Sequence, residues 1–184
     1  MQARHALKKL SDAQLVILAR QQLPYATTAY EELMRRHEKP LLSLCRNLCG
    51  NEADAEDAFQ EVLLRVFHNL PRFRGDASFR TWVYRIAYNE CMTLIRRRKD
   101  HDDMDDHPEP EAPAPAEAAD DGQPSFHHLI AHLGEEDRSV LALRLISDLD
   151  FNDIATITQS GLSAVKMRYK RALEKLKPLM ENLR

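Results

Sequence analysis

One stretch of the chain combines aromatic rings, cations and an amide at helical spacing. The segment Phe79–Lys99, FRTWVYRIAYNECMTLIRRRK, contains no glycine or proline and ends in four consecutive cations. Arg85, Tyr88 and Asn89 are three and four residues apart, so a helix would place them on one face. Aromatic rings stack on unpaired bases, and cations follow the phosphate backbone. The segment therefore predicts a helix that can bind single-stranded nucleic acid.

The other face of this predicted helix is apolar, which leaves a simpler interpretation open. Phe79, Val83 and Ile86 share one side with Ala87 and Leu94. A helix that only packs into a core, with a solvated basic end, would show the same spacing. The six residues before the helix, 73–78, are mostly small and polar, and they predict a loop.

A second pattern near the C-terminus is typical of duplex DNA binding. Asp150 can cap a helix over Phe151–Thr158, and a turn at 159–161 leads into a helix over Leu162–Lys177. One face of that last helix is apolar and the opposite face is basic, as suits a helix lying in a major groove. The basic face consists of Ser163, Lys166, Met167, Lys170 and Arg171, with Arg168 at its flank.

The elements that must position these residues all have helical signals. Ser11 with Gln14 forms a capping box, and Pro24 should end the helix that follows. A second helix is expected from about Tyr25, with a kink or restart at Pro40 and an end at Gly50. The next helix begins after Asn51 in an acidic turn and should stop at Pro71. With five glycines in 184 residues, the sequence predicts an all-α protein.

The net charge of −3 conceals two basic bodies and an acidic segment between them. Residues 100–122 contain ten acidic residues and no Lys or Arg, so the remainder carries +7. Five prolines and many alanines make residues 100–124 an extended linker without periodicity. We therefore expect two small helical domains, over residues 1–99 and 125–184. Their basic surfaces suit a nucleic-acid partner.

Composition argues against several other classes of protein. No apolar run is long enough to cross a bilayer, the N-terminus lacks a secretory core, and three cysteines form no disulfide framework, which suits the cytoplasm. Possible metal ligands are Cys45 with Cys49, the His101 and His107 tract, and His128 with His132. None of these offers enough ligands in an ordered setting, so no metal, cofactor or catalytic residue is expected.

Three segments, in this order, resemble the extracytoplasmic-function group of bacterial RNA polymerase sigma factors. FRGDASFRTWVYRIAYNE is similar to the promoter-melting segment of that family, and DAEDAFQEVLLRVFHNL upstream is similar to its polymerase-docking helix. LDFNDIATITQSGLSAVKMRYKRALEKL resembles its helix-turn-helix. The phrases YEELMRR, AYNEC and KMRYKRALEKL look closest to the sigma-X type. The three segments span nearly the whole chain outside the linker.

The resemblance implies a role for each of these surfaces. The resemblance implies that the polymerase is bound by Asp54, Asp57, Gln60, Glu61 and Arg65. Recognition of the opened −10 strand falls to Phe73, Arg74, Gly75, Asp76, Ala77, Ser78, Trp82, Arg85, Tyr88, Asn89, Arg96, Arg97 and Arg98. Recognition of the −35 duplex falls to Ser163, Lys166, Met167, Arg168, Lys170 and Arg171. Many members have an arginine where this chain has Lys166, which predicts an altered specificity.

The sequence thus predicts a non-enzymatic specificity subunit of RNA polymerase that reads and opens promoters. The resemblance also implies an anti-sigma protein as a further partner. Two alternatives remain open. A helix-turn-helix regulator acting without polymerase would leave the aromatic and basic N-terminal half unexplained. A metal-dependent hydrolase using the Asp and His tract would need an ordered linker.

Overall fold

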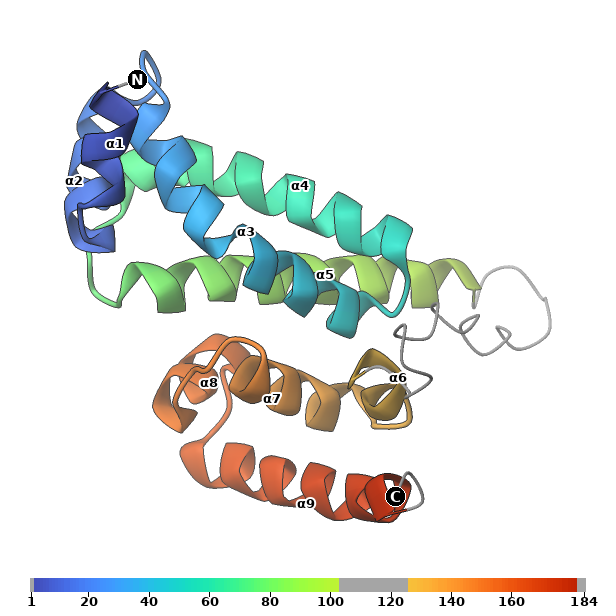
Figure 1. Cartoon of the computed structure of the whole chain (residues 1–184). Helices are drawn as coiled ribbons and strands as arrows, with labels where there is room; N and C mark the ends of the chain where they lie inside the picture. The colour runs from blue at the N-terminus through green and yellow to red at the C-terminus, as the bar shows by residue number, and fades with distance from the viewer. Residues whose placement is uncertain (1, 103–125, 182–184) are drawn as a thin grey trace.

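The computed structural model describes residues 2–102 and 126–181, and all regular elements in these ranges are helical. The bounds are α1 Gln2–Lys8, α2 Asp12–Gln22, α3 Thr28–Cys49, α4 Glu52–Asn69, the 3-10 turn η1 Leu70–Arg72, α5 Phe79–Asp102, α6 Phe126–Ala131, α7 Glu135–Leu145, α8 Phe151–Thr158 and α9 Leu162–Glu181. Helices α1–α5 form one body and α6–α9 a second body beside it (Figure 1). The predicted all-α fold is confirmed.

The helix ends follow the capping residues that the sequence offers. Ser11 and Gln14 form the complete capping box of α2, and the Asn51 side chain accepts a hydrogen bond from the Asp54 amide at the start of α4. Gly50 ends α3 in the left-handed region, with φ 82°. Asp150 accepts hydrogen bonds from two amides of α8. The sequence could predict these helix ends because each capping residue pairs with backbone groups that would otherwise lack a hydrogen-bond partner.

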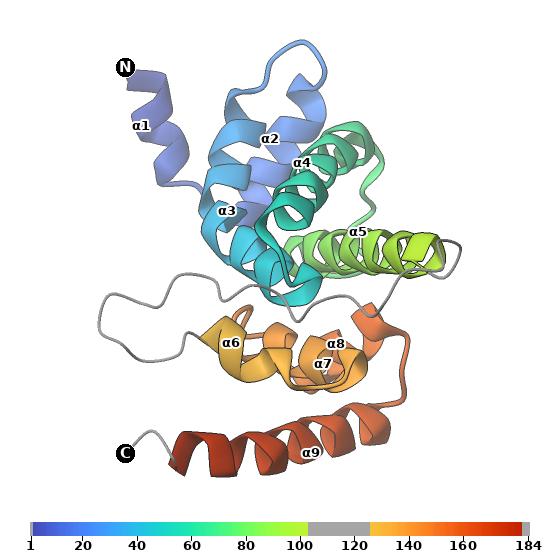
Figure 2. The ribbon, with the colours of Figure 1, turned by 90° about the vertical axis from the view of Figure 1, so that its right-hand side faces the viewer.

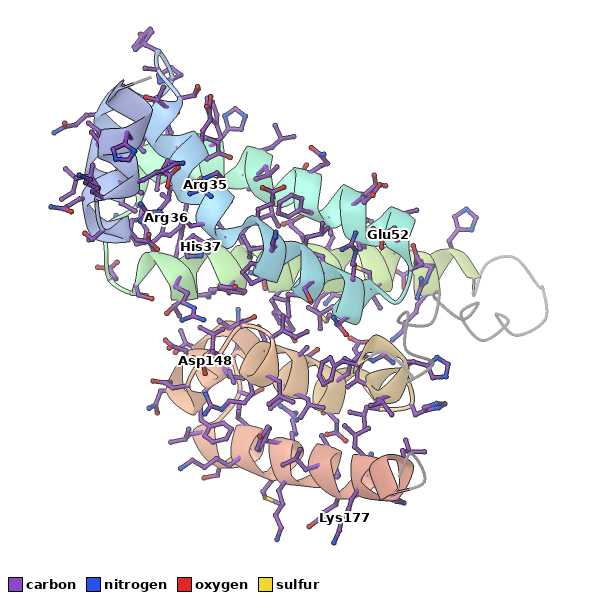
Figure 3. All side chains as sticks on the ribbon, in the orientation of Figure 1. Arg35, Arg36, His37, Glu52, Asp148 and Lys177 are labelled. Carbon is purple, nitrogen blue, oxygen red and sulfur yellow. The ribbon has the colours of Figure 1, made fainter. Side chains whose placement is uncertain are left out.

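Two features of the N-terminal body differ from the predictions. Of the kink or restart predicted at Pro40, the restart does not occur, because α3 continues through the proline to Cys49. Buried leucines on both sides of the proline, such as Leu33 and Leu41, hold the two halves of the helix in one core. The extra helix α1 has no strong local signal of its own. Arg36 of α3 anchors it by donating hydrogen bonds to the carbonyls of Leu7 and Leu10 (Figure 3).

The N-terminal core lies between α3, α4 and α5. Val62 and Val66 of α4 and Val83 and Ala87 of α5 are fully buried. The C-terminal body has its own apolar seam between α7, α8 and α9. Its fully buried members include Val140, Leu141, Ile154, Val165 and Ala172. Each core fixes one long helix, α5 or α9, and part of the remaining surface of each helix is exposed.

The two bodies pack against each other along α3 and α5, as Figure 2 shows from the side. Thr81 donates a hydrogen bond to Asp153 of α8 at 2.8 Å, and Lys99 forms an ion pair with Glu135 of α7 at 2.6 Å. Arg80 donates to the backbone carbonyl of Ser147. The predicted linker, residues 100–124, lies outside the described residues apart from its first three, which extend α5.

Within residues 2–102 and 126–181, no helix is both long and apolar enough to span a membrane.

Candidate nucleic-acid interface

A cavity of about 480 Å³ opens between the 73–78 loop and the exposed side of α5. Predicted −10 residues line it: Phe73, Arg74, Gly75, Asp76, Ala77, Trp82, Arg85 and Asn89. The structure therefore places side by side the loop and the helix face that the resemblance assigns to one −10 site. Arginines, an amide and two aromatic rings around a cavity of this size suit an unstacked base and its phosphate.

Hydrogen bonds at the start of α5 hold the loop in place. The Ser78 hydroxyl accepts a hydrogen bond from the Thr81 amide at 3.0 Å, and the Ser78 carbonyl accepts one from the Trp82 amide. Ser78 itself does not line this cavity, and its role is to position the helix. Gly75 has φ 82°, a left-handed conformation that residues with a Cβ adopt at a cost. The loop shape thus depends on a glycine and a serine.

An ion-pair network contributes to the wall of the cavity. Arg65 of α4 pairs with Glu61 at 3.0 Å and with Glu90 of α5 at 2.9 Å. Burial raises the pKa of the Glu90 carboxyl, and the Arg65 guanidinium partly offsets this effect. Arg65, Asn69, Arg72, Ile86 and Glu90 all line the cavity. The sequence predicts that Arg65 contacts the polymerase, yet the structure places this side chain at the cavity wall.

Glu90 and Arg72 are cavity residues that the sequence did not predict. Glu90 lies one helical turn after Ile86 and two turns after Trp82, so helical spacing was a signal that could have found it. Its ion pair with Arg65 of α4 is a contact that spacing could not show. Arg72 lies in η1, one residue before the loop, and its charge was the only available signal.

The structure separates Tyr88 from the residues that share its predicted face. Arg85 and Asn89 line the cavity, whereas Tyr88 is half-buried near Ser139 and Glu135 of α7. Burial raises the pKa of the Tyr88 hydroxyl. Side chains three and four residues apart share a helix face only broadly, and the C-terminal body covers the side that Tyr88 occupies. Its predicted contact with DNA stays a prediction.

The basic end of α5 is partly neutralised within the chain. Arg98 forms an ion pair with Asp54 at 3.2 Å, and Lys99 pairs with Glu135. Arg96 and Arg97 are exposed and make no ion pair within the described part of the chain. Asp54, which the sequence assigns to the polymerase surface, is half-buried by the contact with Arg98. On the same helix as Asp54, Asp57 and Gln60 are exposed.

The outer face of α9 presents the predicted −35 residues. Ser163, Lys166, Met167 and Lys170 are exposed, and Met167 retains 73% of its accessible surface. Lys170 lies 3.8 Å from Glu174, a weak surface pair. These four side chains form a continuous strip on α9, which lies on the side of the C-terminal body away from the N-terminal body (Figure 1).

Two arginines of the predicted −35 set are bound within the C-terminal body. Arg171 binds buried Asp137 through both oxygens, at 2.6 Å for the shortest bond, and Lys175 adds a bond of 3.0 Å. The Arg171 guanidinium lowers the pKa of the Asp137 carboxyl. Arg168 donates to Ser160 at 2.8 Å and pairs with Glu136. Both guanidinium groups thus hold α9 on its neighbours.

Among the described residues, no group of three or more His, Cys, Asp or Glu side chains is arranged to bind a metal ion. Cys45, Cys49 and Cys91 are free thiols, and all three are buried. His107 lies outside the described residues.

Known sequence families match both bodies. The family described as Sigma-70 region 2 matches residues 33–101, and the one described as Sigma-70, region 4 matches residues 124–176. The RNA polymerase sigma-H factor of Pseudomonas aeruginosa is 30% identical over 169 residues, 84% of this chain and 88% of that protein. The ECF RNA polymerase sigma factor SigW of Bacillus subtilis is 25% identical, covering 84% of this chain and 90% of SigW.

Solved structures show the same fold. CnrH, in complex with the cytosolic domain of CnrY, superposes with a TM-score of 0.68 at 23% identity, covering 93% of this chain and 97% of CnrH. RpoE from Bartonella quintana, in complex with the anti-sigma factor NepR, gives 0.71 at 22%, covering 85% of this chain and 98% of RpoE. Together, the family matches, the relatives and the fold show that this chain belongs to the extracytoplasmic-function group of the sigma-70 family of RNA polymerase sigma factors.

Proposed function

We propose that this sigma factor reads a −35 duplex with α9 and traps the opened −10 strand with the 73–78 loop and α5. The chain is a transcription initiation factor and not an enzyme. The observation that carries the residue assignment is the cavity in which Trp82, Arg85 and Asn89 converge with the loop. Extruding a base costs a few kcal/mol, and only a base that fits the cavity recovers this cost.

Polymerase binding is assigned to the exposed acidic and polar side of α4. Asp57 and Gln60 project into solvent, and Asp54 and Glu61 extend the same side, each already paired with an arginine of this chain. Basic residues on a partner surface would compete with these arginines for the two carboxylates. Their attraction to the acidic side of α4 would also speed up association. Arg65 contributes through its hold on Glu61 and Glu90.

The two DNA surfaces are chemically different, which suits two states of one promoter. The cavity offers aromatic rings and arginines for an unpaired strand. The strip on α9 offers two lysines, a serine and a methionine that can enter a major groove. Lys166 supplies one compact charge in place of a planar guanidinium, so we expect no bidentate guanine contact there.

Run-off transcription tests the proposal. The purified chain is mixed with bacterial core RNA polymerase and genomic fragments, and start sites and permanganate-reactive thymines are mapped. We expect defined start sites with an unpaired region at −10 only when the chain is present. A chain that binds duplex DNA tightly without core enzyme, and never directs initiation, would instead be a stand-alone regulator.

Three finer assignments accompany the proposal. We place the protein in the cytoplasm, where core polymerase lies. By analogy with the NepR complex, we propose an anti-sigma protein as a further partner. The sigma-X type rests only on three sequence phrases and is not supported by the relatives named above, so promoter mapping must decide it.

A further inference from the structure

Met167 is a long apolar side chain on the otherwise polar outer face of α9. It retains 73% of its accessible surface. A single exposed apolar side chain is common on protein surfaces, so its meaning depends on its place. Ser163, Lys166 and Lys170 surround it on this face, and all three are exposed. Packing within the chain therefore does not account for a methionine at this position, whereas a contact with the bound DNA would.

Met167 lies at the centre of the strip and near the start of its helix. Since α9 begins at Leu162, Met167 belongs to its second turn. Ser163 lies one turn before it and Lys170 one turn after it. When the second helix of a helix-turn-helix enters a major groove, its N-terminal residues contact the base edges. Met167 is therefore placed to meet a base, with a lysine on either side along the helix.

The orientation of the helix around Met167 is fixed by contacts with the rest of the C-terminal body. Arg168 donates a hydrogen bond to Ser160 at 2.8 Å, just before α9 begins. One turn after Met167, Arg171 binds the buried carboxylate of Asp137 at 2.6 Å. These contacts hold the backbone next to Met167 and one turn beyond it, so the methionine is presented to solvent from a fixed position.

The major groove of DNA offers a methyl group on one base, thymine. The other groups at the base edges there are hydrogen-bond donors or acceptors. A thioether has no hydrogen to donate and is only a weak acceptor, so it suits these polar groups poorly. The same side chain is flexible and polarisable, and it packs well against small apolar groups. The chemistry of Met167 therefore matches the C5-methyl group of thymine.

A protein partner is the competing occupant for an exposed apolar side chain. An apolar protein surface placed on Met167 would also cover Lys166 and Lys170, and removing these charges from water without a partner is costly. DNA satisfies both features of the strip, because its phosphates neutralise lysines while a thymine methyl group packs on the methionine. Charge complementarity therefore favours DNA.

We propose that Met167 is a specificity-determining residue of the −35 contact and reads the C5-methyl group of one thymine. This inference rests on the proposed function and deepens it, because it names a base that α9 selects and the group by which the base is recognised. Lys166 and Lys170 supply affinity through their charges, whereas Met167 supplies the preference for thymine at one position.

Deletion of single methyl groups from the DNA tests the inference with the full chain bound to core polymerase. The probes are duplexes that carry the −35 region of a promoter found by start-site mapping. In each probe one thymine of either strand is replaced by uracil, which lacks only the methyl group. We expect one position at which the replacement weakens binding about fourfold, since burial of one methyl group has an effect of that size. Replacement at other positions should have little effect.

Variants assign the sensitive position to Met167. Met167→Ala should bind the thymine and uracil probes equally, because it lacks the side chain that contacts the methyl group. Met167→Leu keeps an apolar side chain and should keep the preference for thymine. Leu173→Ala is the matched control, because Leu173 is also an exposed apolar residue of α9 but lies six residues further along, and it should behave as wild type. Circular dichroism checks that each variant is folded.

The outcomes separate this inference from the proposed function. A position whose sensitivity persists in Met167→Ala would overturn the inference, because another residue would then read the methyl group. So would the absence of any sensitive position, and the −35 surface would still stand if alanine at both Lys166 and Lys170 lowers the salt slope. If that double variant also leaves the slope unchanged, the proposed function of α9 fails as well. Weaker binding of Met167→Ala to core polymerase without DNA would identify a protein contact instead.

Discussion

At the scale of single residues, Asp137 shows how the C-terminal body uses its cations. The carboxylate is 3% exposed and is held by Arg171 and Lys175. We expect Asp137→Asn to destabilise the protein by about 2 kcal/mol, because it removes charge-assisted hydrogen bonds at a buried site. Thermal unfolding followed by circular dichroism measures this. An unchanged melting temperature would show that the network contributes nothing.

The same carboxylate predicts a pH dependence. Because its pKa is lower in the folded chain than in the unfolded chain, its contribution is complete above the ordinary aspartate pKa of about 4. The contribution disappears as the pH falls through the lower folded pKa. The difference in stability between wild type and Asp137→Asn should therefore shrink as the pH falls below about 4. A difference that stays constant down to about pH 2 would contradict this assignment.

Lys166 and Lys170 carry the predicted contact with duplex DNA. Replacing both with alanine should weaken binding of the polymerase complex to promoter DNA, and the salt slope should fall by about 0.9 for each phosphate that is no longer neutralised. Lys177→Ala is the control, because this lysine is also exposed but lies at the far end of α9 (Figure 3). Filter binding at several salt concentrations gives the slopes. Equal slopes for the double variant and wild type would mean that another face meets the DNA.

At the scale of elements, the loop before α5 depends on one left-handed residue. Gly75 has φ 82°, and a Cβ added there would meet no atom within 4 Å, so backbone strain is the only cost of a substitution. We expect Gly75→Val to strain the loop by about 1–2 kcal/mol and to weaken binding of the opened strand. Gly75→Asn should be tolerated better, because asparagine visits this region more readily. Equal binding by the two variants would indicate that the loop shape is unimportant.

At the scale of the whole molecule, the contact between the two bodies sets the spacing of the DNA surfaces. A compact chain of this length has a radius of gyration of about 16 Å. Two promoter elements about 25 base pairs apart are separated by about 85 Å at about 3.4 Å per pair. On the proposed assignment of the DNA surfaces, the chain must therefore extend when both are engaged, and the contacts of α3 and α5 with the C-terminal body must break.

This requirement gives a prediction about the contact between Thr81 and Asp153. Asp153→Lys removes the acceptor and places a cation near Arg80, so the two bodies should separate more readily. Small-angle scattering of the isolated chain should show a larger radius of gyration. Asn152→Lys adds a positive charge at an exposed neighbouring position and should leave the radius unchanged. Identical radii for both variants would mean that apolar packing alone holds the bodies together.

The sequence alone determined most of the helices and their capped ends, because capping residues and apolar spacing act within a few residues of each other. It also brought the loop and the exposed side of α5 together in one proposal. The tertiary structure decided the rest. It turned Tyr88 toward α7, placed Arg65 and Glu90 at the cavity and bound Arg171 to Asp137. Each of these depends on residues distant in the chain, and a helical period cannot tell which neighbour will cover which side of a helix.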